Sequence, residues 1–494
     1  MNTHTKTLFT RLGAAWILPA LIAVLGLMLA VRATAQPFAT LHSFPVSVSG
    51  VNSDGAKPLA GLILSGNTLY GTAYIGGTNG NGAVFAVNTD SSGFTNLHSF
   101  TALAGPYPPT NSDGANPHGG LILSGNTLYG TAQAGGGSGV GTVFAINTDS
   151  SGFTNLHSFT ATTGPNFTNS DGAHPYAVLI LSGKTLYGTS VDGGSSGNGT
   201  VFAVSTNGTG FTNLYNFSGG NDGANPEGGL VLAGNTLYGT TFYGGTNGNG
   251  TVFAISTNGT GFTKLYSFTA KNYNGATGGM TNSDGANPYA VLILSGNTLY
   301  GTASTGGDSD FGIGTVFAIN TDSSGFTNLH SFIGNAAEPF AGLILSDNTL
   351  YGTATLQGNS GYGTVFAVNT NGTGFTNFYN FSGGSDGAYP EGTLVLSGNT
   401  LYGTAEGGAS PSANGTVFSL SLGSAAPLLT ILPSGTNVIL TWTNTASGFT
   451  LLFTTNLVAP VVWSTNSTAP VVISGQNTVT NPISGTQKFY RLSH

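Results

Sequence analysis

The sequence predicts an all-β protein, in which a seven-bladed β-propeller closed by an N-terminal strand is followed by a small β-sandwich. Three observations favour this fold class. The chain of 494 residues contains 80 Gly and only 5% charged residues, against about 25% in ordinary soluble domains. The tetrapeptide Leu-Tyr-Gly-Thr occurs seven times, and a strand that the last repeat lacks has its counterpart near the N-terminus.

The composition excludes several other classes of protein. Four Glu are too few for long amphipathic helices, which need Ala, Leu, Glu and Lys. Gly without a strict three-residue period excludes collagen, and 39% hydrophobic residues argue against disorder. The formal charge of −8 excludes a nucleic-acid partner held by clustered Lys and Arg. The chain has no Cys, which excludes disulfides and thiolate sites.

Residues 1–35 have the pattern of a secretory signal peptide. Two positive charges precede an apolar run over 14–31, and the Ala-Thr-Ala at 33–35 forms a cleavage site. The alternative is an uncleaved anchor, because about 18 apolar residues nearly span a bilayer. We expect cleavage, since Pro19 interrupts the run. The mature protein is then secreted, extracellular or on the cell surface, with no membrane span.

Each repeat contains four segments that predict strands. In the first repeat they are Leu62–Leu64, Thr68–Ala73, Ala83–Asn88 and Phe94–Phe100, separated by turns rich in Gly, Asn, Asp and Ser. The Leu-Tyr-Gly-Thr copies lie 51 to 62 residues apart. A four-stranded meander at this period is typical of a propeller blade. A parallel β-helix is the rival architecture, but its coil is much shorter than this unit.

The seventh repeat ends after Val417–Leu420 and lacks its fourth strand, whereas Phe38–Phe44 reads as an extra copy of that strand. We expect the N-terminal strand to complete the last blade, which would close residues 36–422 into a ring without an orphan edge. The alternative is an in-register array, with Phe38–Phe44 as the inner strand of the first blade.

The repeat unit resembles a known family. The motif runs from Pro58 through Leu-Tyr-Gly-Thr to Gly-Gly, Val-Phe-Ala and Leu-His-Ser-Phe, and it is similar to the GloVer-type (Gloeo_Verruco) tandem repeat of exported bacterial choice-of-anchor proteins. The resemblance covers residues 38–422 and all seven copies. It implies a β-propeller but confers no known activity.

The repeats stop before residues 423–427, which read as a linker. Residues 428–494 contain six apolar or alternating segments: 428–432, 437–442, 449–454, 461–464, 471–473 and 489–492. They predict a small fibronectin-like or immunoglobulin-like sandwich.

The candidate binding residues follow from the meander. The loops after the second strand and after the fourth strand share one face, which carries the longer and more variable loops. The residue after the motif Pro varies and lies at the channel mouth. The ligand-binding candidates at this position are His118, Tyr176, Glu227, Tyr289, Phe340 and Glu391, with Leu59 in the first repeat. Aromatic and polar side chains there could hold a sugar or peptide; the alternative is a tolerant, half-exposed position.

Six repeats carry Asp before Gly-Ala in the loop that enters the first strand: Asp54, Asp113, Asp171, Asp222, Asp284 and Asp386. We interpret these residues as Asx-type turns. A ring of Ca²⁺ ligands is the alternative, although one carboxylate per blade does not fill six oxygen positions. We therefore expect no cofactor and no metal site.

No catalytic residue is assigned. Three blades separate Glu227 from Glu391, and their carboxyls should lie about 10 Å apart, too far for a glycosidase pair. His42, His98, His157 and His330 occupy a fourth-strand position where other repeats have Tyr, which indicates packing with a polar tip rather than metal ligation. The expected function is a monomeric, non-enzymatic binding or cell-surface structural protein that contacts a glycan or protein. The alternative is an extracellular polysaccharide lyase or hydrolase.

Overall fold

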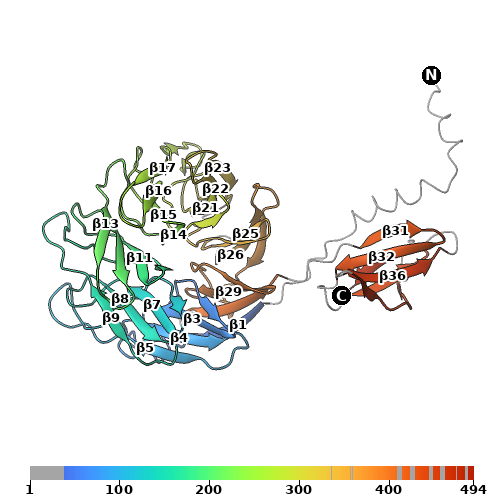
Figure 1. Ribbon diagram of the computed structural model, residues 1–494, viewed down its shortest axis with the longest axis horizontal. Coiled ribbons are helices and arrows are strands. Elements are labelled where there is room, and N and C mark those ends of the chain that lie inside the picture. Colours follow the sequence, from blue (N-terminus) through green and yellow to red (C-terminus); the bar gives the residue numbers. More distant parts are fainter. Residues whose placement is uncertain are drawn as a thin grey trace, which may run out of the picture. The chain divides into compact units, whose positions relative to one another are not determined.

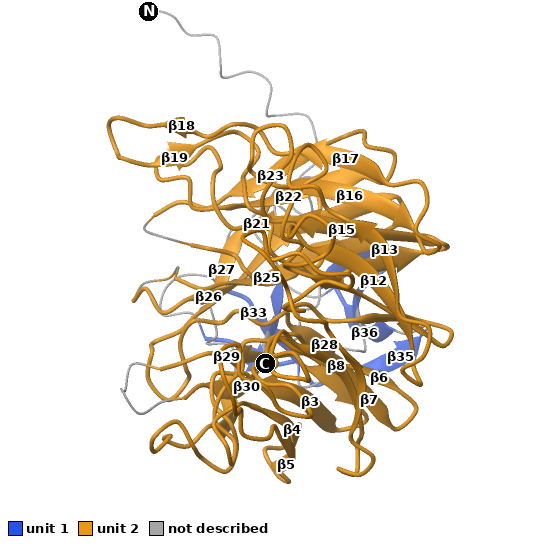
Figure 2. Cartoon of the chain, turned by 90° about the vertical axis from the view of Figure 1, so that its left-hand side faces the viewer, with its two compact units in different colours: residues 1–37, 422–494 blue, residues 38–421 orange. Residues whose placement is uncertain are grey.

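The computed structural model describes residues 38–334, 337–356, 358, 360–408, 414–422, 429–443, 449–456, 462–473, 476–483 and 488–493. The predicted signal peptide and linker lie outside these residues. The chain divides into two compact units, one spanning Phe38–Ser421 and the other combining Met1–Pro37 with Leu422–His494 (Figure 2). In the described residues, no helix is long and apolar enough to span a membrane.

Within the described part of Phe38–Ser421, six repeats each form a sheet of four antiparallel strands in chain order, and the last repeat supplies three strands of a sheet that β1 completes. The first strands are β2 (Ile63–Ser65), β6 (Ile122–Ser124), β10 (Ile180–Ser182), β14 (Val231–Ala233), β20 (Ile293–Ser295), β24 (Ile344–Ser346) and β28 (Val395–Ser397). The second strands are β3 (Thr68–Ala73), β7 (Thr127–Ala132), β11 (Thr185–Ser190), β15 (Thr236–Thr241), β21 (Thr298–Ala303), β25 (Thr349–Ala354) and β29 (Thr400–Ala405).

The third strands are almost fully buried. They are β4 (Ala83–Asn88), β8 (Thr142–Asn147), β12 (Thr200–Ser205), β16 (Thr251–Ser256), β22 (Thr315–Asn320), β26 (Thr364–Asn369) and β30 (Thr416–Ser421). The fourth strands are β5 (Thr95–Ser99), β9 (Thr154–Ser158), β13 (Thr212–Asn216), β17 (Thr263–Ser267), β23 (Thr327–Ser331), β27 (Thr376–Asn380) and, in the last sheet, β1 (Phe38–Ser43). A small hairpin of β18 (Asn272–Tyr273) and β19 (Met280–Thr281) extends one loop.

The Leu-Tyr-Gly-Thr motif joins one sheet to the next. Leu69 is fully buried in the core between sheets. A Cβ on Gly71 would lie 2.7 Å from Phe85 Cζ, so only Gly fits at this position. Thr72 Oγ1 donates to the carbonyl oxygen of Gly119 in the following repeat, at 3.0 Å. The motif therefore recurs because three of its four positions are fixed by packing or hydrogen bonding.

The N-terminal strand lies in the last sheet. β1 pairs with β30 in antiparallel register, with Phe38 opposite Leu420 and Ser43 opposite Thr416. This pairing confirms the circular offset and contradicts the in-register alternative, because the first sheet is β2-β3-β4-β5. Without β1, the edge of β30 would be left unpaired.

The last sheet also packs against the first. Leu41 and Val417 share a buried cluster with Leu69, and Thr404 Oγ1 donates to the carbonyl oxygen of Ala60 at 2.8 Å. The repeat sheets are thus arranged around a common centre (Figure 1). The fold of this unit is all-β and β-propeller-like.

The C-terminal residues form a separate small core. One sheet has the order β31 (Thr430–Ser434), β32 (Asn437–Thr443), β36 (Gln476–Pro482) and β35 (Val471–Ile473), and the other has β34 (Ser464–Thr465), β33 (Thr450–Thr454) and β37 (Phe489–Ser493). Leu440, Trp442, Leu451 and Val479 form its buried hydrophobic cluster. β36 was not predicted, because Val479 is its only large apolar residue and Pro482 ends it.

Candidate functional site

The loops on one face of the repeat unit differ from the turns on the other. Loops after the second and fourth strands pair with each other through bridges such as Ala115 with Ala134, so they share one face. We call this the loop-rich face. Within the described part of Phe38–Ser421, every exposed large apolar side chain lies in these loops: Val46, Val48, Val51, Tyr107, Phe167, Tyr243, Tyr273, Met280, Phe311 and Ile333. Burial of such side chains by a ligand would be favourable.

The sequence-predicted site residues occupy equivalent, half-buried places on this face. In each repeat the residue before the motif Pro has a positive φ, for example 54° at His174 and 52° at Asn225. This left-handed turn directs the chain towards the first strand. The residue after Pro therefore reaches the centre of the face, and we call the set of Leu59, His118, Tyr176, Glu227, Tyr289, Phe340 and Glu391 the mouth ring.

Four members of the mouth ring touch one another. The rings of His118 and Tyr176 stack at 4.7 Å and 16°. Tyr289 comes from a repeat three positions further on, yet its hydroxyl lies 3.4 Å from His118 Nε2. Phe340 packs edge-on against Tyr289 at 5.2 Å. These residues form one aromatic cluster, rather than separate walls of an open channel.

The two acidic members of the mouth ring, Glu227 and Glu391, have raised pKa values. Burial raises the pKa of Glu227 to about 7, and the carboxylate of Asp192 adds to the effect. Burial also raises the pKa of Glu391 to about 7, and the carboxylate of Glu406 adds to that shift. Near neutral pH each carboxyl is partly protonated, so it can donate as well as accept a hydrogen bond.

The same environment keeps the cluster neutral. Burial lowers the pKa of His118 to about 4. Burial, followed by the charges of Glu227 and Glu391, raises the pKa of Tyr289 far above its usual range. The aromatic cluster therefore presents neutral rings, with His118 as an acceptor or donor according to its tautomer.

A second set of residues, which the sequence analysis missed, surrounds the mouth ring. Tyr74 packs edge-on against His118 at 5.8 Å, and Gln133 Nε2 donates to the hydroxyl of Tyr176 at 2.8 Å. Both follow the second strand of their repeats at a position that varies from copy to copy. That variability inside a fixed motif was the signal that could have identified them.

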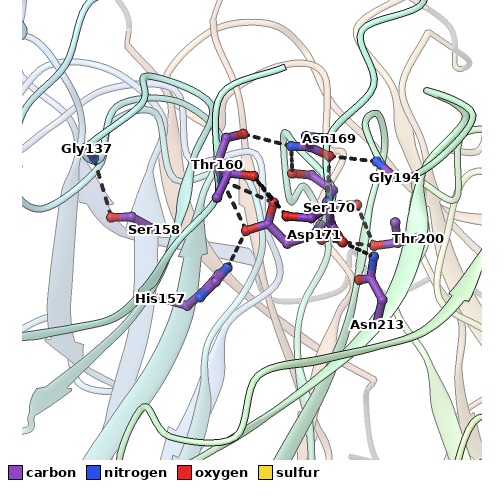
Figure 3. A network of polar contacts seen from close by, with 12 residues as sticks. Gly137, His157, Ser158, Thr160, Asn169, Ser170, Asp171, Gly194, Thr200 and Asn213 are labelled. Atoms are coloured by element: carbon purple, nitrogen blue, oxygen red, sulfur yellow. Dashed lines mark hydrogen bonds and ion pairs between the residues drawn. The ribbon is translucent and has the colours of Figure 1, made fainter. Parts of the chain in front are cut away.

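The Asp residues in the loops before the first strands have a different role from the expected one (Figure 3). Asp171 Oδ2 accepts from His157 Nε2 at 2.9 Å and from the backbone N–H of Thr160 at 3.1 Å. The Asx-turn interpretation was wrong for this residue, because Asn169 makes the turn: its Oδ1 accepts the N–H of Gly172 at 2.9 Å. We call the bonds from the fourth strand to this Asp the Asp clamp.

The Asp clamp recurs with His or Tyr as the partner. The pairs are His98–Asp113 at 2.8 Å, His157–Asp171 at 2.9 Å, Tyr215–Asp222 at 3.1 Å, Tyr266–Asp284 at 2.8 Å and Tyr379–Asp386 at 3.0 Å. His42 Nε2 lies 3.1 Å from Asp54. These His rings also pack on a Phe of the next repeat, as His98 does on Phe153 at 3.9 Å. In these three repeats, the fourth-strand His is a packing residue whose polar tip lies against Asp.

A family model described as the Gloeobacter/Verrucomicrobia repeat matches residues 25–166, 161–286 and 279–436. No curated protein matches the chain. Similar solved structures include a nidogen/laminin complex (14% identity, 64% of this chain and 96% of that chain, TM-score 0.39) and a putative 6-phosphogluconolactonase from Bacteroides uniformis (18%, 69% and 88%, 0.42). An oligogalacturonate lyase in complex with manganese is also similar (8%, 80% and 95%, 0.46).

Proposed function

The chain belongs to the Gloeobacter/Verrucomicrobia repeat family, and on that premise we propose that it is an exported, non-enzymatic protein that binds a glycan. In this proposal, the repeats form a closed seven-bladed β-propeller and the C-terminal residues form a fibronectin-like sandwich. The ligand lies on the loop-rich face, over the mouth ring.

The uneven distribution of exposed apolar side chains carries the proposal. The exposed apolar residues of the described repeat unit lie on the loop-rich face, including Tyr107 at 96% and Tyr273 at 70% exposure. Turns on the opposite face consist of small and polar residues such as Ser65, Asn67 and Asp90. The confinement of these side chains to one face, rather than any single exposed residue, supports a ligand there.

The chemistry of the mouth ring favours a glycan over a protein. Aromatic rings provide flat apolar surfaces, and partly protonated carboxyls at Glu227 and Glu391 can either donate to or accept from hydroxyl groups. Beside the exposed apolar side chains, the surrounding loops supply the amide and hydroxyl groups of Asn, Ser and Thr. A sugar chain, with C–H faces and many hydroxyls, matches both features.

Glycan binding by the full chain tests the proposal. A glycan array should identify a ligand, and His118→Ala and Tyr176→Ala should each weaken its binding by about tenfold or more, as at central contact residues. Thr209→Ala, in an exposed turn on the other face, is the matched control and should bind normally. Unchanged binding in both mouth variants would show that the mouth ring is not part of the site. If the chain bound no glycan on the array but bound a protein, the ligand would be a protein instead of a glycan.

One observation favours the alternative enzyme. A carboxyl with a pKa of about 7, such as that of Glu227 or Glu391, suits a general acid. Polysaccharide turnover by the wild type that Glu227→Gln or Glu391→Gln abolishes would overturn the binding-only function.

A further inference from the structure

A groove of about 540 Å³ lies at the outer side of the loop-rich face, between β13 and β17. Its volume is in the range of small-ligand sites. Tyr215 and Phe262 form an aromatic wall, with their rings stacked at 4.0 Å and 6°. Asn216, Ser218, Asn221, Asp222 and Lys264 complete the lining. The groove is separate from the mouth ring, whose residues do not line it.

Lys264 departs from the repeat at this groove. The equivalent residue is Asn in the other repeats that carry the motif: Asn96, Asn155, Asn213, Asn328 and Asn377. Four of these amides donate to a Ser carbonyl in the neighbouring loop, for example Asn213 Nδ2 to Ser170 at 2.9 Å. Lys264 Nζ instead donates to Asn221 Oδ1 and to Thr246 Oγ1. Lys264 therefore keeps a bond to the same loop position, through the side chain of Asn221 instead of a Ser carbonyl, and adds a positive charge there.

The ammonium of Lys264 has no carboxylate partner in the described residues, where the ion pairs involve Lys57 and the His residues only. Asp222 is nearby, but its oxygens accept from the hydroxyl of Tyr215 and from the N–H and hydroxyl of Ser218. The local acid is thus occupied by donors from its own loop and strand.

Among the described residues, the side-chain amides of the groove have unpartnered donors. Asn216 Oδ1 accepts from Ser195 N–H at 3.1 Å, and Asn221 Oδ1 accepts from Lys264 and Thr246. The Nδ2 groups of these two amides have no partner among the described residues. Together with the third proton of Lys264, they would satisfy a ligand that carries acceptors and a negative charge.

We propose that this groove binds a carboxylate-bearing sugar unit, with the carboxylate on Lys264 and the ring oxygens on Asn216 and Asn221. The proposal rests on the proposed glycan function and names an acidic class of glycan. The formal charge of −8 disfavours a densely charged polyanion. The ligand is therefore a glycan with separated acidic units, one of which enters the groove.

Lys264→Asn is the direct test, because it restores the residue that five other repeats accept. Lys184→Asn is the matched control: Lys184 also stands where other repeats have Asn, in an exposed turn on the opposite face. The full-length proteins are titrated calorimetrically with a glucuronate-containing oligosaccharide and with its carboxyl-reduced, neutral form. Loss of one charge-assisted bond should weaken acidic-ligand binding by about tenfold or more in Lys264→Asn, and Lys184→Asn should bind as the wild type does.

The groove site would be overturned by equal affinity of Lys264→Asn and the wild type, or by equal affinity for the acidic and neutral forms. Free acetate that binds as tightly as the oligosaccharide would also overturn it, because the sugar would then contribute nothing. Glycan binding that His118→Ala abolishes and Lys264→Asn leaves unchanged would refute the groove and keep the proposed function. Binding that Lys264→Asn abolishes and His118→Ala leaves unchanged would refute the mouth ring as a binding site and support the groove.

Discussion

Two kinds of junction join the fourth strand of one repeat to the following loop, and His98 and His330 represent them. His98 Nε2 lies 2.8 Å from Asp113 Oδ2, inside an Asp clamp. His330 occupies the same position two residues before the end of its motif, and it stacks on Phe375 at 3.5 Å as His98 stacks on Phe153. The sequence that follows has Asn335-Ala336 instead of Asp-Gly, and the buried Nε2 of His330 has no hydrogen-bond partner in the described residues.

The difference separates the packing role of this position from its polar role. The ring of His330 remains packed without an Asp, so stacking alone is enough to hold the side chain. Its electrostatics change, because burial lowers the pKa of His330 to about 4. At Asp113, burial alone would raise the pKa, but hydrogen bonds from His98 and Thr101 outweigh it and lower the pKa. The Asp clamp therefore stabilises the buried carboxylate of Asp113, which burial alone would disfavour.

The largest expected effect is the loss of a clamp Asp. Asp113→Ala should lower the free energy of unfolding by about 2–4 kcal/mol, because the His98 ring and the N–H of Thr101 would lose a buried acceptor. Chemical denaturation at pH 7 measures the change.

Asp149→Ala is the matched control for this variant. Asp149 also accepts from an N–H and a hydroxyl, both of Ser151, but in an exposed turn where water can replace it. Its loss should change stability far less. Equal effects of the two substitutions would show that the Asp clamp has no special energetic role.

The next effect is a pH dependence that belongs to His330. Its folded pKa of about 4 lies below the unfolded value of 6.5, so the unfolded state binds more protons between these values. Stability is then complete above pH 6.5 and falls as the pH drops towards 4, by up to about 3 kcal/mol. The carboxyls of Glu227 and Glu391, with pKa values raised to about 7, have the opposite sign, since they destabilise the fold as the pH rises from 4.5 to 7.

The difference between the wild type and His330→Phe isolates the contribution of His330. Unfolding free energies of both proteins should be measured from pH 4.5 to pH 8. The variant should gain stability relative to the wild type as the pH falls below 6.5. Parallel curves across this range would mean that His330 titrates normally.

The same substitution should have opposite signs at the two junctions at pH 7. His330→Phe removes a buried nitrogen that has no partner among the described residues, and the position accepts the larger Tyr in other repeats, so stability should rise by about 1 kcal/mol. His98→Phe leaves Asp113 without one of its donors and should lower stability by about 1–2 kcal/mol. Melting temperatures of the two variants measure the sign directly. A loss of stability in both variants would mean that the shape of the imidazole ring, rather than the Asp clamp, determines what this position contributes to stability.

The repeats and their strands could be predicted from the sequence because local signals agree with packing. Leu69, Gly71 and Thr72 recur unchanged, and each has a contact that requires it. The strand β36 and the Asp clamp could not be predicted in this way. Asp113 bonds to residues twelve to fifteen positions earlier, across a loop of variable length. A local reading of Asp-Gly assigns the turn to Asp, whereas the Asn two residues before it makes that turn.

The sequence predicted which residues form the mouth ring, but it did not predict which of their side chains contact one another. Variability after the motif Pro identified the mouth ring, and ring geometry implied residues facing each other across a channel. The contact between Tyr289 and His118 depends on how far two side chains reach across the centre, which no spacing in the sequence specifies. Lys264 was visible as a departure from the repeat, yet the groove beside it arises from the neighbouring loop.

The smallest expected effect concerns the Tyr version of the clamp. Tyr379→Phe removes a hydroxyl that donates to Asp386 Oδ2 at 3.0 Å, but three donors remain on that carboxylate: the N–H and hydroxyl of Ser382 and the N–H of Gly384. Asp113 would keep only the two donors of Thr101 after loss of His98. Stability should therefore fall by about 0.5–1 kcal/mol, less than in His98→Phe measured by the same denaturation. A loss as large as that of His98→Phe would mean that the fourth-strand donor governs every junction regardless of how many other donors the Asp has.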